Sequence, residues 1–364
     1  MQLPFATSLI LVGAIFGPQG FNYVSIDPSM ELFGFLGAAF LMLLAGLEVK
    51  GSYLKKSRKD ITLLFLLNTA VPFITGAGIV LLFQYNWATA IVTGILFMSS
   101  STALIFSNIK FIRLENTRIG RTLKSTVVLE DMASLLFLSL LIQYQDVDSR
   151  FPPLIYLGLL VSSIVILRMF LPEIVLYFFK RFHVERDEHE ERLRVILAFF
   201  LFVVIIYSSM HVHPIIAAFV VGFILSEVEG IQPLKRKLHT IGYGIFVPIF
   251  FFIIGVETDF RVFFQIENAN ILLIGLVVGG ILSKLVSGFL GARLENFSPI
   301  ESGFMGTATV TKLTTTISTS YAALLLELID PTILTAMVMI SVVSTVIGPI
   351  SMNLIAKRIL IAKA

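Results

Sequence analysis

Residues 271–281 read ILLIGLVVGGI, a run without a single charged or polar side chain. Similar runs recur along the whole 364-residue chain, in which hydrophobic residues make up 56% and charged residues 14%. An ordinary soluble domain contains about 25% charged residues. The composition therefore excludes a soluble enzyme, a disordered chain and a nucleic-acid-binding protein, so no nucleic-acid partner is expected. It predicts a protein embedded in the lipid bilayer.

The apolar runs are long enough to cross a bilayer as helices, because about 20 residues span its hydrocarbon core. They are continuous rather than alternating, which favours helices over a β-barrel. We therefore expect an all-α polytopic membrane protein, a single transmembrane domain over residues 1–364 with about 12 transmembrane helices. The predicted spans are 4–24, 30–49, 61–83, 88–109, 121–143, 153–179, 194–210, 214–228, 239–257, 269–292, 300–326 and 332–356.

Basic residues collect in alternate loops between these spans. The loops that follow even-numbered spans, the span ends that adjoin them and the C-terminal tail together hold 22 of the 27 Lys and Arg residues. The opposite loops hold only Arg150 and Arg261. Because Lys and Arg collect in cytoplasmic loops, this asymmetry predicts a multi-pass protein of the cell membrane with both termini in the cytoplasm.

The two halves of the chain have similar spacing, since span starts recur at an offset of about 210 residues. This offset predicts repeat one over 1–145, linker spans over 146–212 and repeat two over 213–364. By the predicted topology, spans 1–5 and spans 8–12 have opposite orientations. Inverted five-helix repeats are typical of secondary transporters, whose substrate site lies near the membrane midplane.

Spans 4 and 11, which the repeat places in equivalent positions, are unusually polar. Residues 99–102 are SSST, and residues 307–320 contain nine Ser or Thr residues and one Lys. These hydroxyls either bond their own backbone carbonyls and neighbouring helices, or line a polar cavity where both helices are interrupted and cross. The matched positions favour the second interpretation. Its candidate cavity-lining residues are Ser100, Ser101, Thr102, Thr309, Lys312 and Thr314.

Few ionisable residues lie deep within a span, where a charge costs about 2.5–3.5 kcal/mol. The deep acids are Glu130 and Asp131, and the deep cations besides Lys312 are Arg168 and Lys284. Arg168 is expected to pair with Glu173 or to anchor the linker. Lys284 needs an anionic partner, and the two deep acids are the candidates. The alternative is a structural ion pair without a role in transport.

An ionised carboxylate beside hydroxyl and carbonyl oxygens provides hard ligands for Na⁺ or Li⁺, with K⁺ as an alternative. Because one buried carboxylate holds either a proton or a metal ion, the two compete for the site. The pattern therefore predicts exchange of a monovalent cation for protons. Such exchange needs no cofactor, since the ion gradients drive it, and the sequence has no P-loop.

Five segments resemble the monovalent cation:proton antiporter-2 family, which includes sodium/proton antiporters and the membrane domains of potassium-efflux systems. The resemblance covers nearly the whole chain, and the order and spacing of the segments are more specific than any one segment alone. The segments are GPQG (17–20), LLAGLE (43–48), SSSTAL (99–104), residues 222–226 and FFFIIG (250–255).

The resemblance implies a panel for homodimerisation and a mobile core that moves like an elevator, with spans 4 and 11 crossing. It implies that Asp131 binds the transported Na⁺ and that Glu130 pairs with Lys284 of span 10. Glu130 stands where members carry Asp or Gln, and retention of an acid implies electrogenic Na⁺/H⁺ exchange. Span 11 departs from the family, because TKLT (311–314) replaces Pro-Arg-Gly-Glu. No regulatory nucleotide-binding domain is expected in this chain.

Three other functions remain as alternatives to electrogenic Na⁺/H⁺ antiport. The nearest is K⁺/H⁺ antiport by the same site. Another is a proton- or sodium-coupled symporter of an organic anion, in which Lys284 or Lys312 contacts the substrate. A conducting channel is disfavoured by the predicted repeat and the paired deep acids.

Overall fold

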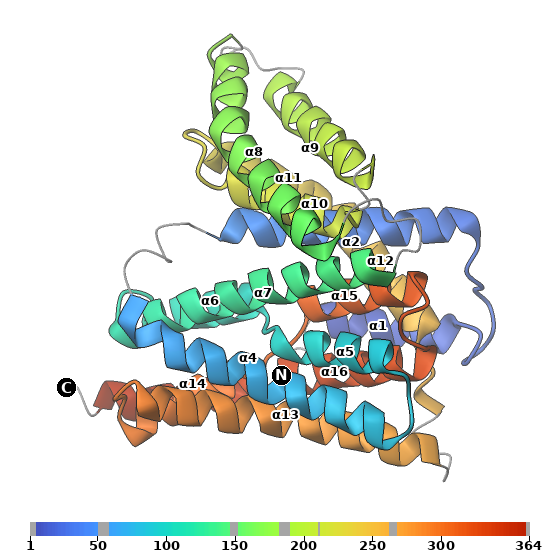
Figure 1. Cartoon of the computed structure of the whole chain (residues 1–364), viewed down its shortest axis with the longest axis vertical. Coiled ribbons are helices and arrows are strands. Elements are labelled where there is room, and N and C mark those ends of the chain that lie inside the picture. Colours follow the sequence, from blue (N-terminus) through green and yellow to red (C-terminus); the bar gives the residue numbers. More distant parts are fainter. Residues whose placement is uncertain are drawn as a thin grey trace. The chain divides into compact units, whose positions relative to one another are not determined.

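The computed structural model describes residues 5–49, 58–145, 152–181, 190–209, 212–261 and 268–361. Throughout these ranges the secondary structure is helical, without a β-strand (Figure 1). The helices are α1 (Phe5–Phe16), α2 (Pro28–Glu48), α4 (Arg58–Leu82), α5 (Trp87–Met98), α6 (Thr102–Phe111), α7 (Arg118–Gln145), α8 (Pro153–Arg181), α9 (Glu191–Ser209), α10 (Pro214–Leu225), α11 (Gln232–Ile241), the π-helix η2 (Gly242–Phe246), α12 (Val247–Glu257), α13 (Asn268–Leu294), α14 (Pro299–Thr309), α15 (Thr314–Leu325) and α16 (Pro331–Ile361).

The prediction of an all-α polytopic membrane protein is confirmed. Within the described ranges, nine helical segments are long and apolar enough to cross a membrane, and α1 and α10 are shorter apolar helices. Helix occupies each of the twelve predicted spans. Two of them, 88–109 and 300–326, are interrupted, as their Ser and Thr content predicted. Arg150 and much of the basic loop sequence lie outside the described residues.

The helices form two compact units, whose limits fall inside α2, α7 and α12. Unit 1 comprises Met1–Met30, Ser52–Leu135 and Phe251–Ala364, and unit 2 comprises Glu31–Gly51 and Leu136–Phe250. These limits differ from the predicted repeat boundaries near 145 and 212. The units reflect packing whereas a repeat reflects symmetry, so the repeats stay a prediction.

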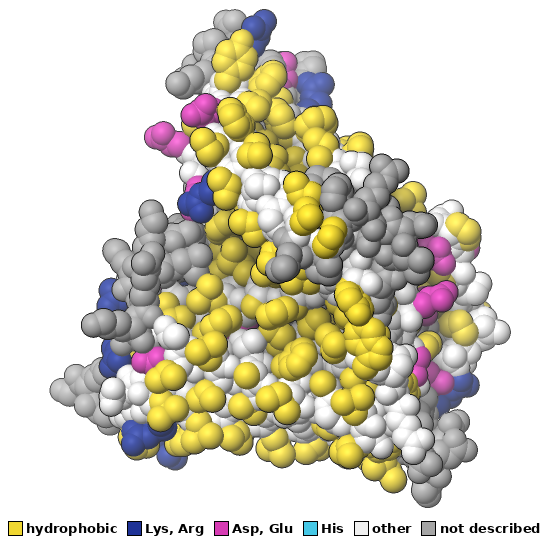
Figure 2. Space-filling model, viewed as in Figure 1, with side chains coloured by type: hydrophobic (Ala, Val, Ile, Leu, Met, Phe, Trp, Pro, Cys, Tyr) yellow, Lys and Arg dark blue, Asp and Glu magenta, His cyan; other side chains and the backbone are white. Residues whose placement is uncertain are grey.

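In unit 1, α13 has one apolar exposed face and one partly polar buried face. Its exposed side chains recur every three or four residues, at Ile271, Ile274, Val278, Leu282, Val286, Leu290 and Leu294. The buried face carries Ser283, Lys284 and Ser287. Figure 2 shows hydrophobic side chains over the outer faces of α4 and α13, with charged side chains toward the helix ends. Because lipid favours the apolar face, this periodicity directs Lys284 into the protein.

Glycines let α13 approach α14 closely. A Cβ atom at Gly306 would lie 2.6 Å from the carbonyl oxygen of Leu285, and one at Gly288 would lie 2.9 Å from the Gly306 Cα. Small residues permit such backbone contact between membrane helices. The contact holds the backbone beside Lys284 against α14.

In unit 2, Arg168 of α8 pairs with Glu227, which follows α10, and not with Glu173. The Arg168 Nη2 lies 2.8 Å from the Glu227 Oε2. Glu173 follows Arg168 by five residues, whereas helical neighbours are separated by three or four. The expectation of a partner on the same helix was therefore wrong.

Asp330 caps the N-terminus of α16 in unit 1. Its Oδ1 accepts a 2.9 Å bond from the Ile333 N–H, and its Oδ2 accepts a 2.8 Å bond from the Tyr85 hydroxyl. Burial and this carboxylate raise the pKa of Tyr85 to about 12, so the phenol remains a donor.

Asp330→Ala is expected to lower the free energy of unfolding by about 1 kcal/mol, because α16 loses its cap. Thermal denaturation in detergent measures the effect. Asp330→Asn is the matched control, since its amide oxygen can still accept from the Ile333 N–H. An equal loss of stability in both variants would contradict the capping role.

Candidate functional site

The candidate site lies in unit 1, where two broken helices meet. Residues 99–101 separate α5 from α6, and residues 310–313 separate α14 from α15. Ser99 and Ser101 have extended backbone. The Ser101 N–H donates to the Thr311 carbonyl at 2.7 Å, and the Ser99 and Thr316 hydroxyls lie 2.9 Å apart. The two interruptions are therefore hydrogen-bonded to each other.

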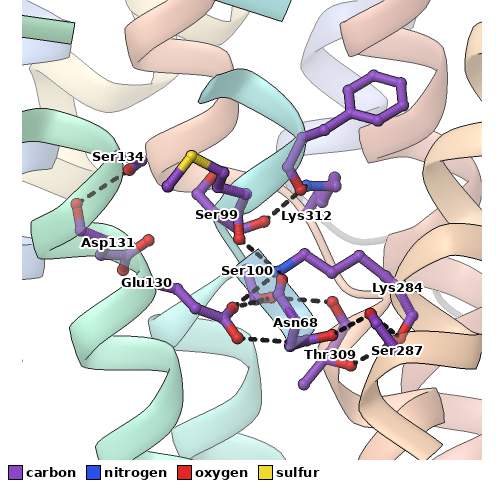
Figure 3. A network of polar contacts seen from close by, with 12 residues as sticks. Asn68, Ser99, Ser100, Glu130, Asp131, Ser134, Lys284, Ser287, Thr309 and Lys312 are labelled. Carbon is purple, nitrogen blue, oxygen red and sulfur yellow. Dashed lines mark hydrogen bonds and ion pairs between the residues drawn. The ribbon is translucent and has the colours of Figure 1, made fainter. Parts of the chain in front are cut away.

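Lys312 caps the C-terminal end of α5. Its ammonium donates to the carbonyls of Leu96 at 3.3 Å, Phe97 at 2.7 Å and Ser99 at 2.6 Å, and its side chain is fully buried (Figure 3). The last carbonyls of a helix lack helical partners and carry partial negative charge. Lys312 satisfies and neutralises them at the break.

Glu130 of α7 uses both of its carboxylate oxygens. Its Oε1 accepts from the Asn68 Nδ2 at 2.5 Å. Its Oε2 accepts from the Ser100 hydroxyl at 2.7 Å and from the Lys284 Nζ at 2.8 Å. Glu130 and Lys284 are 0% exposed. A buried ion pair is stable only when hydrogen bonds also satisfy its charged atoms, and this network supplies them.

The Lys284 ammonium has three acceptors from three helices. Besides Glu130 of α7, it donates to the Asn68 carbonyl of α4 at 3.0 Å and to the Met98 carbonyl at the end of α5. An ammonium has three N–H donors, so each has a partner. Figure 3 shows Glu130, Asn68 and Lys284 converging at the centre of this network.

Asp131 faces a different environment, because adjacent helix positions point about 100° apart. Its Oδ2 accepts a 2.8 Å bond from Thr102, the first residue of α6. Thr315, the second residue of α15, lies beside the same carboxyl group without a standard hydrogen bond. Asp131 thus lies at two helix N-termini, which favour negative charge.

The Asp131 carboxyl group has unused acceptor capacity. Its Oδ1 is buried and has no hydrogen-bond partner among the described residues. The hydroxyls of Ser101, Thr314 and Ser318 are likewise buried without a partner within those ranges. An orphaned buried carboxylate oxygen is costly unless a ligand or proton binds it. Asp131 therefore has free capacity to coordinate a ligand, which Glu130 lacks.

The predicted site residues differ in what they contact. Ser100 and Thr102 bond the two acids, and Ser101 and Thr314 lie at the breaks. The Thr309 hydroxyl turns instead to backbone, donating to the Lys284 carbonyl at 3.3 Å and the Gly306 carbonyl at 3.1 Å. Within the described chain, the side-chain bonds of Lys312 also go to backbone. Thr309 and Lys312 were predicted to line a cavity. Their hydrogen bonds instead connect α14 to α13 and the second break to the end of α5.

Sequence reasoning missed Asn68 and Ser287. The Ser287 hydroxyl donates to the Asn68 Oδ1 at 2.7 Å, which completes the network around Glu130. A signal was present, since Asn68 is the one amide residue in the predicted span 61–83 and lies four residues before Pro72. The significance of Asn68 depends on the contact between its carbonyl and the Lys284 ammonium, which joins two different helices.

Comparisons with known proteins agree on one family and one fold. The family model described as "Sodium/hydrogen exchanger, transmembrane" matches residues 1–358. The protein "Probable Na(+)/H(+) antiporter 3" of Methanocaldococcus jannaschii is 31% identical over 375 residues, covering 100% of this chain and 92% of its own. "Na(+)/H(+) antiporter NhaS5" of Synechocystis sp. is 26% identical, covering 99% of this chain and 52% of its own.

A solved structure shares the fold. The sodium proton antiporter MjNhaP1 from Methanocaldococcus jannaschii at pH 8 superimposes with a TM-score of 0.70 and 17% sequence identity. The match covers 96% of this chain and 91% of that one. At this identity the superposition supports the arrangement of helices alone.

Proposed function

The chain belongs to the transmembrane sodium/hydrogen exchanger family, and we propose that it exchanges Na⁺ or Li⁺ for protons across the membrane. The family consists of cation/proton antiporters rather than enzymes, so the protein is a multi-pass membrane transporter whose substrates are cations and protons. The choice of Na⁺ and Li⁺, the coupling ratio and the movement are our proposals.

The observation that carries this proposal is the Asp131 Oδ1, which has no hydrogen-bond partner in the described part of the chain. It lies near buried hydroxyls where two helix N-termini meet, and Glu130 beside it is saturated with donors. Carboxylate and hydroxyl oxygens are hard ligands of the kind that alkali cations prefer. A proton on Asp131 removes the charge that holds the cation. Cation and proton therefore alternate on one carboxyl group.

Alternating access requires a conformational change. Glu130 and Asp131 are both 0% exposed, so water reaches neither acid in the described conformation. We propose that a mobile core carries Asp131 between the two sides as an elevator. The loaded core is neutralised by a proton or a cation, whereas the empty core carries an uncompensated charge that resists displacement. Exchange is thus coupled.

The Glu130–Lys284 ion pair places a second carboxylate and an ammonium next to the Asp131 site, which supports electrogenic exchange. Glu130→Gln is expected to lower the charge moved per cycle while sparing the fold, since the Gln oxygen can still accept from Lys284 and Ser100. Voltage-clamped flux in proteoliposomes measures this charge. Unchanged voltage dependence would contradict the role of the pair. Glu327→Gln, at the C-terminal end of α15, is the control for removing an acid elsewhere.

The remaining features of the proposal rest on the sequence. The distribution of basic residues supports cytoplasmic termini, and the family supports a homodimer. The equivalent breaks between α5 and α6 and between α14 and α15 support inverted repeats. The exchanger would need no cofactor, because the ion gradients supply the free energy.

The test is dequenching of a pH-sensitive dye in proteoliposomes when Na⁺, Li⁺ or K⁺ is added. We expect a response to Na⁺ and Li⁺ that becomes faster when an ionophore clamps the voltage. A response to K⁺ alone would assign the alternative K⁺/H⁺ antiport. The proposal fails if no monovalent cation produces a response from protein shown to be folded.

A further inference from the structure

Pro72 leaves a backbone acceptor in the middle of α4. Proline has no N–H, so the carbonyl of the residue four positions earlier loses its helical partner. That residue is Asn68, which is 0% exposed. A buried carbonyl without a partner costs free energy. The Lys284 Nζ of α13 donates to this carbonyl at 3.0 Å, so the proline of one helix provides an acceptor for the ammonium of another.

The side chain of Asn68 bonds the other member of the ion pair. Its Nδ2 donates to the Glu130 Oε1 at 2.5 Å, and its Oδ1 accepts from Ser287 at 2.7 Å. A carboxylate can only accept, so the orientation of the amide is fixed. Ser287 lies three residues after Lys284 on α13. Figure 3 shows Asn68 between Glu130 on one side and Lys284 and Ser287 on the other.

The backbone contact of Asn68 with Lys284 and its side-chain contact with Glu130 both lie on one buried face of α4. The buried residues of this helix recur at intervals of three or four, at Ile61, Leu64, Asn68, Pro72, Gly76 and Val80. Asn68 and Pro72 are therefore one turn apart on the side that faces the network. Their separation of four residues is the one at which a proline frees the asparagine carbonyl.

We propose that Asn68 and Pro72 form a positioning element that holds the Lys284 ammonium between the freed Asn68 carbonyl and the Glu130 carboxylate, and that this placement of Lys284 sets the pH range of cation exchange. This inference rests on the proposed function. The charged groups near Lys284 in the described structure are Glu130 and Asp131 from α7 and Lys312 from the second break, whereas α4 and α5 present uncharged acceptors. Asn68 contacts both members of the pair and adds no charge of its own.

Two substitutions should move the pH profile in opposite directions. Pro72→Ala restores an N–H that takes the Asn68 carbonyl, so Lys284 loses acceptor strength and gives up its proton more readily. The pH of half-maximal Na⁺-driven exchange should then fall by about half a unit. Asn68→Asp adds a negative charge close to the Lys284 ammonium, which then keeps its proton more firmly. The same midpoint should then rise by about one unit.

The experiment compares wild-type protein, Pro72→Ala, Asn68→Asp and Pro172→Ala in proteoliposomes, with dye dequenching by Na⁺ across the neutral pH range. Pro172 also lies inside a helix, but no described side chain of α8 is among the site contacts, so the Pro172→Ala variant should keep the wild-type midpoint. Size-exclusion chromatography shows which variants are folded. If Pro72→Ala does not fold, the test depends on Asn68→Asp alone, which keeps the shape of the side chain and should raise the midpoint.

Opposite shifts in the two variants, with an unmoved control, are the result expected. Shifts in the same direction, unmoved midpoints, or a lower maximal rate at an unchanged midpoint would overturn the inference. The melting temperature of each variant in detergent is also recorded against pH. The pH midpoint of this curve is expected to fall for Pro72→Ala and to rise for Asn68→Asp. This second measurement does not require transport. If the wild-type protein exchanges no cation, the proposed function is refuted, and the melting curves still test the positioning element.

Discussion

Asp131→Asn is expected to abolish exchange of every cation, lowering the rate at saturating Na⁺ by at least about 100-fold. The amide cannot take up a proton or balance a bound cation, so neither half of the cycle remains. The Asn side chain has the same shape and can still accept from Thr102, which keeps the helix N-termini in place. Dye dequenching in proteoliposomes measures the loss for Na⁺, Li⁺ and K⁺.

A suitable control removes an acid of the same unit outside the site. Asp259 is paired with the exposed Arg261, and Asp259→Asn should exchange cations at the wild-type rate. Asp131→Asn should elute as a monodisperse protein, because the substitution replaces a buried charge with a neutral group of the same shape. Turnover of Asp131→Asn at a normal apparent affinity for Na⁺ would refute the assignment of Asp131 as the cation ligand.

Lys284→Ala is expected to have the largest effect on stability. It leaves the Glu130 carboxylate at 0% exposure without its cation and removes the donor to the Asn68 and Met98 carbonyls. Breaking a buried pair in this way costs about 3–5 kcal/mol. The measurement is the melting temperature of the detergent-solubilised protein, which should fall well below that of the wild type.

The double variant Glu130→Gln/Lys284→Ala separates the lost charge from the lost packing. Without the carboxylate no charge remains unpaired, so the double variant should melt well above Lys284→Ala alone. If Lys284→Ala melts at the wild-type temperature, the pair does not stabilise the protein. If the double variant is no better than the single one, packing of the lysine chain is the cause of the loss.

The helices and the main site residues were predictable because membranes impose strong constraints. Apolar runs such as 271–281 must be helices, and their lengths fix the spans. A charge deep in a span is expensive, so Glu130, Asp131 and Lys284 stood out without any structure. The breaks near Ser100 and Thr311 were predictable because hydroxyl clusters occur at positions that the predicted repeat makes equivalent.

Other features were not predictable, because their signals are weak or depend on a distant residue. Asn68 is uncharged, and one amide in an apolar span can bond helices anywhere. The effect of Pro72 appears only once Lys284 is known to face α4. A hydroxyl such as that of Thr309 can turn to backbone or to a cavity at similar cost. Pairing between helices, as for Arg168 and Glu227, requires the packing itself.

The end of α5 is bound by two lysines at once. Lys312 holds the carbonyls of Leu96, Phe97 and Ser99, and Lys284 of α13 holds that of Met98. Four successive carbonyls are thereby anchored to two different chain segments. A helix break held by these hydrogen bonds cannot act as a hinge. The interrupted helices would therefore have to move as a rigid body, with bending confined to the loops that connect them to the rest of the chain.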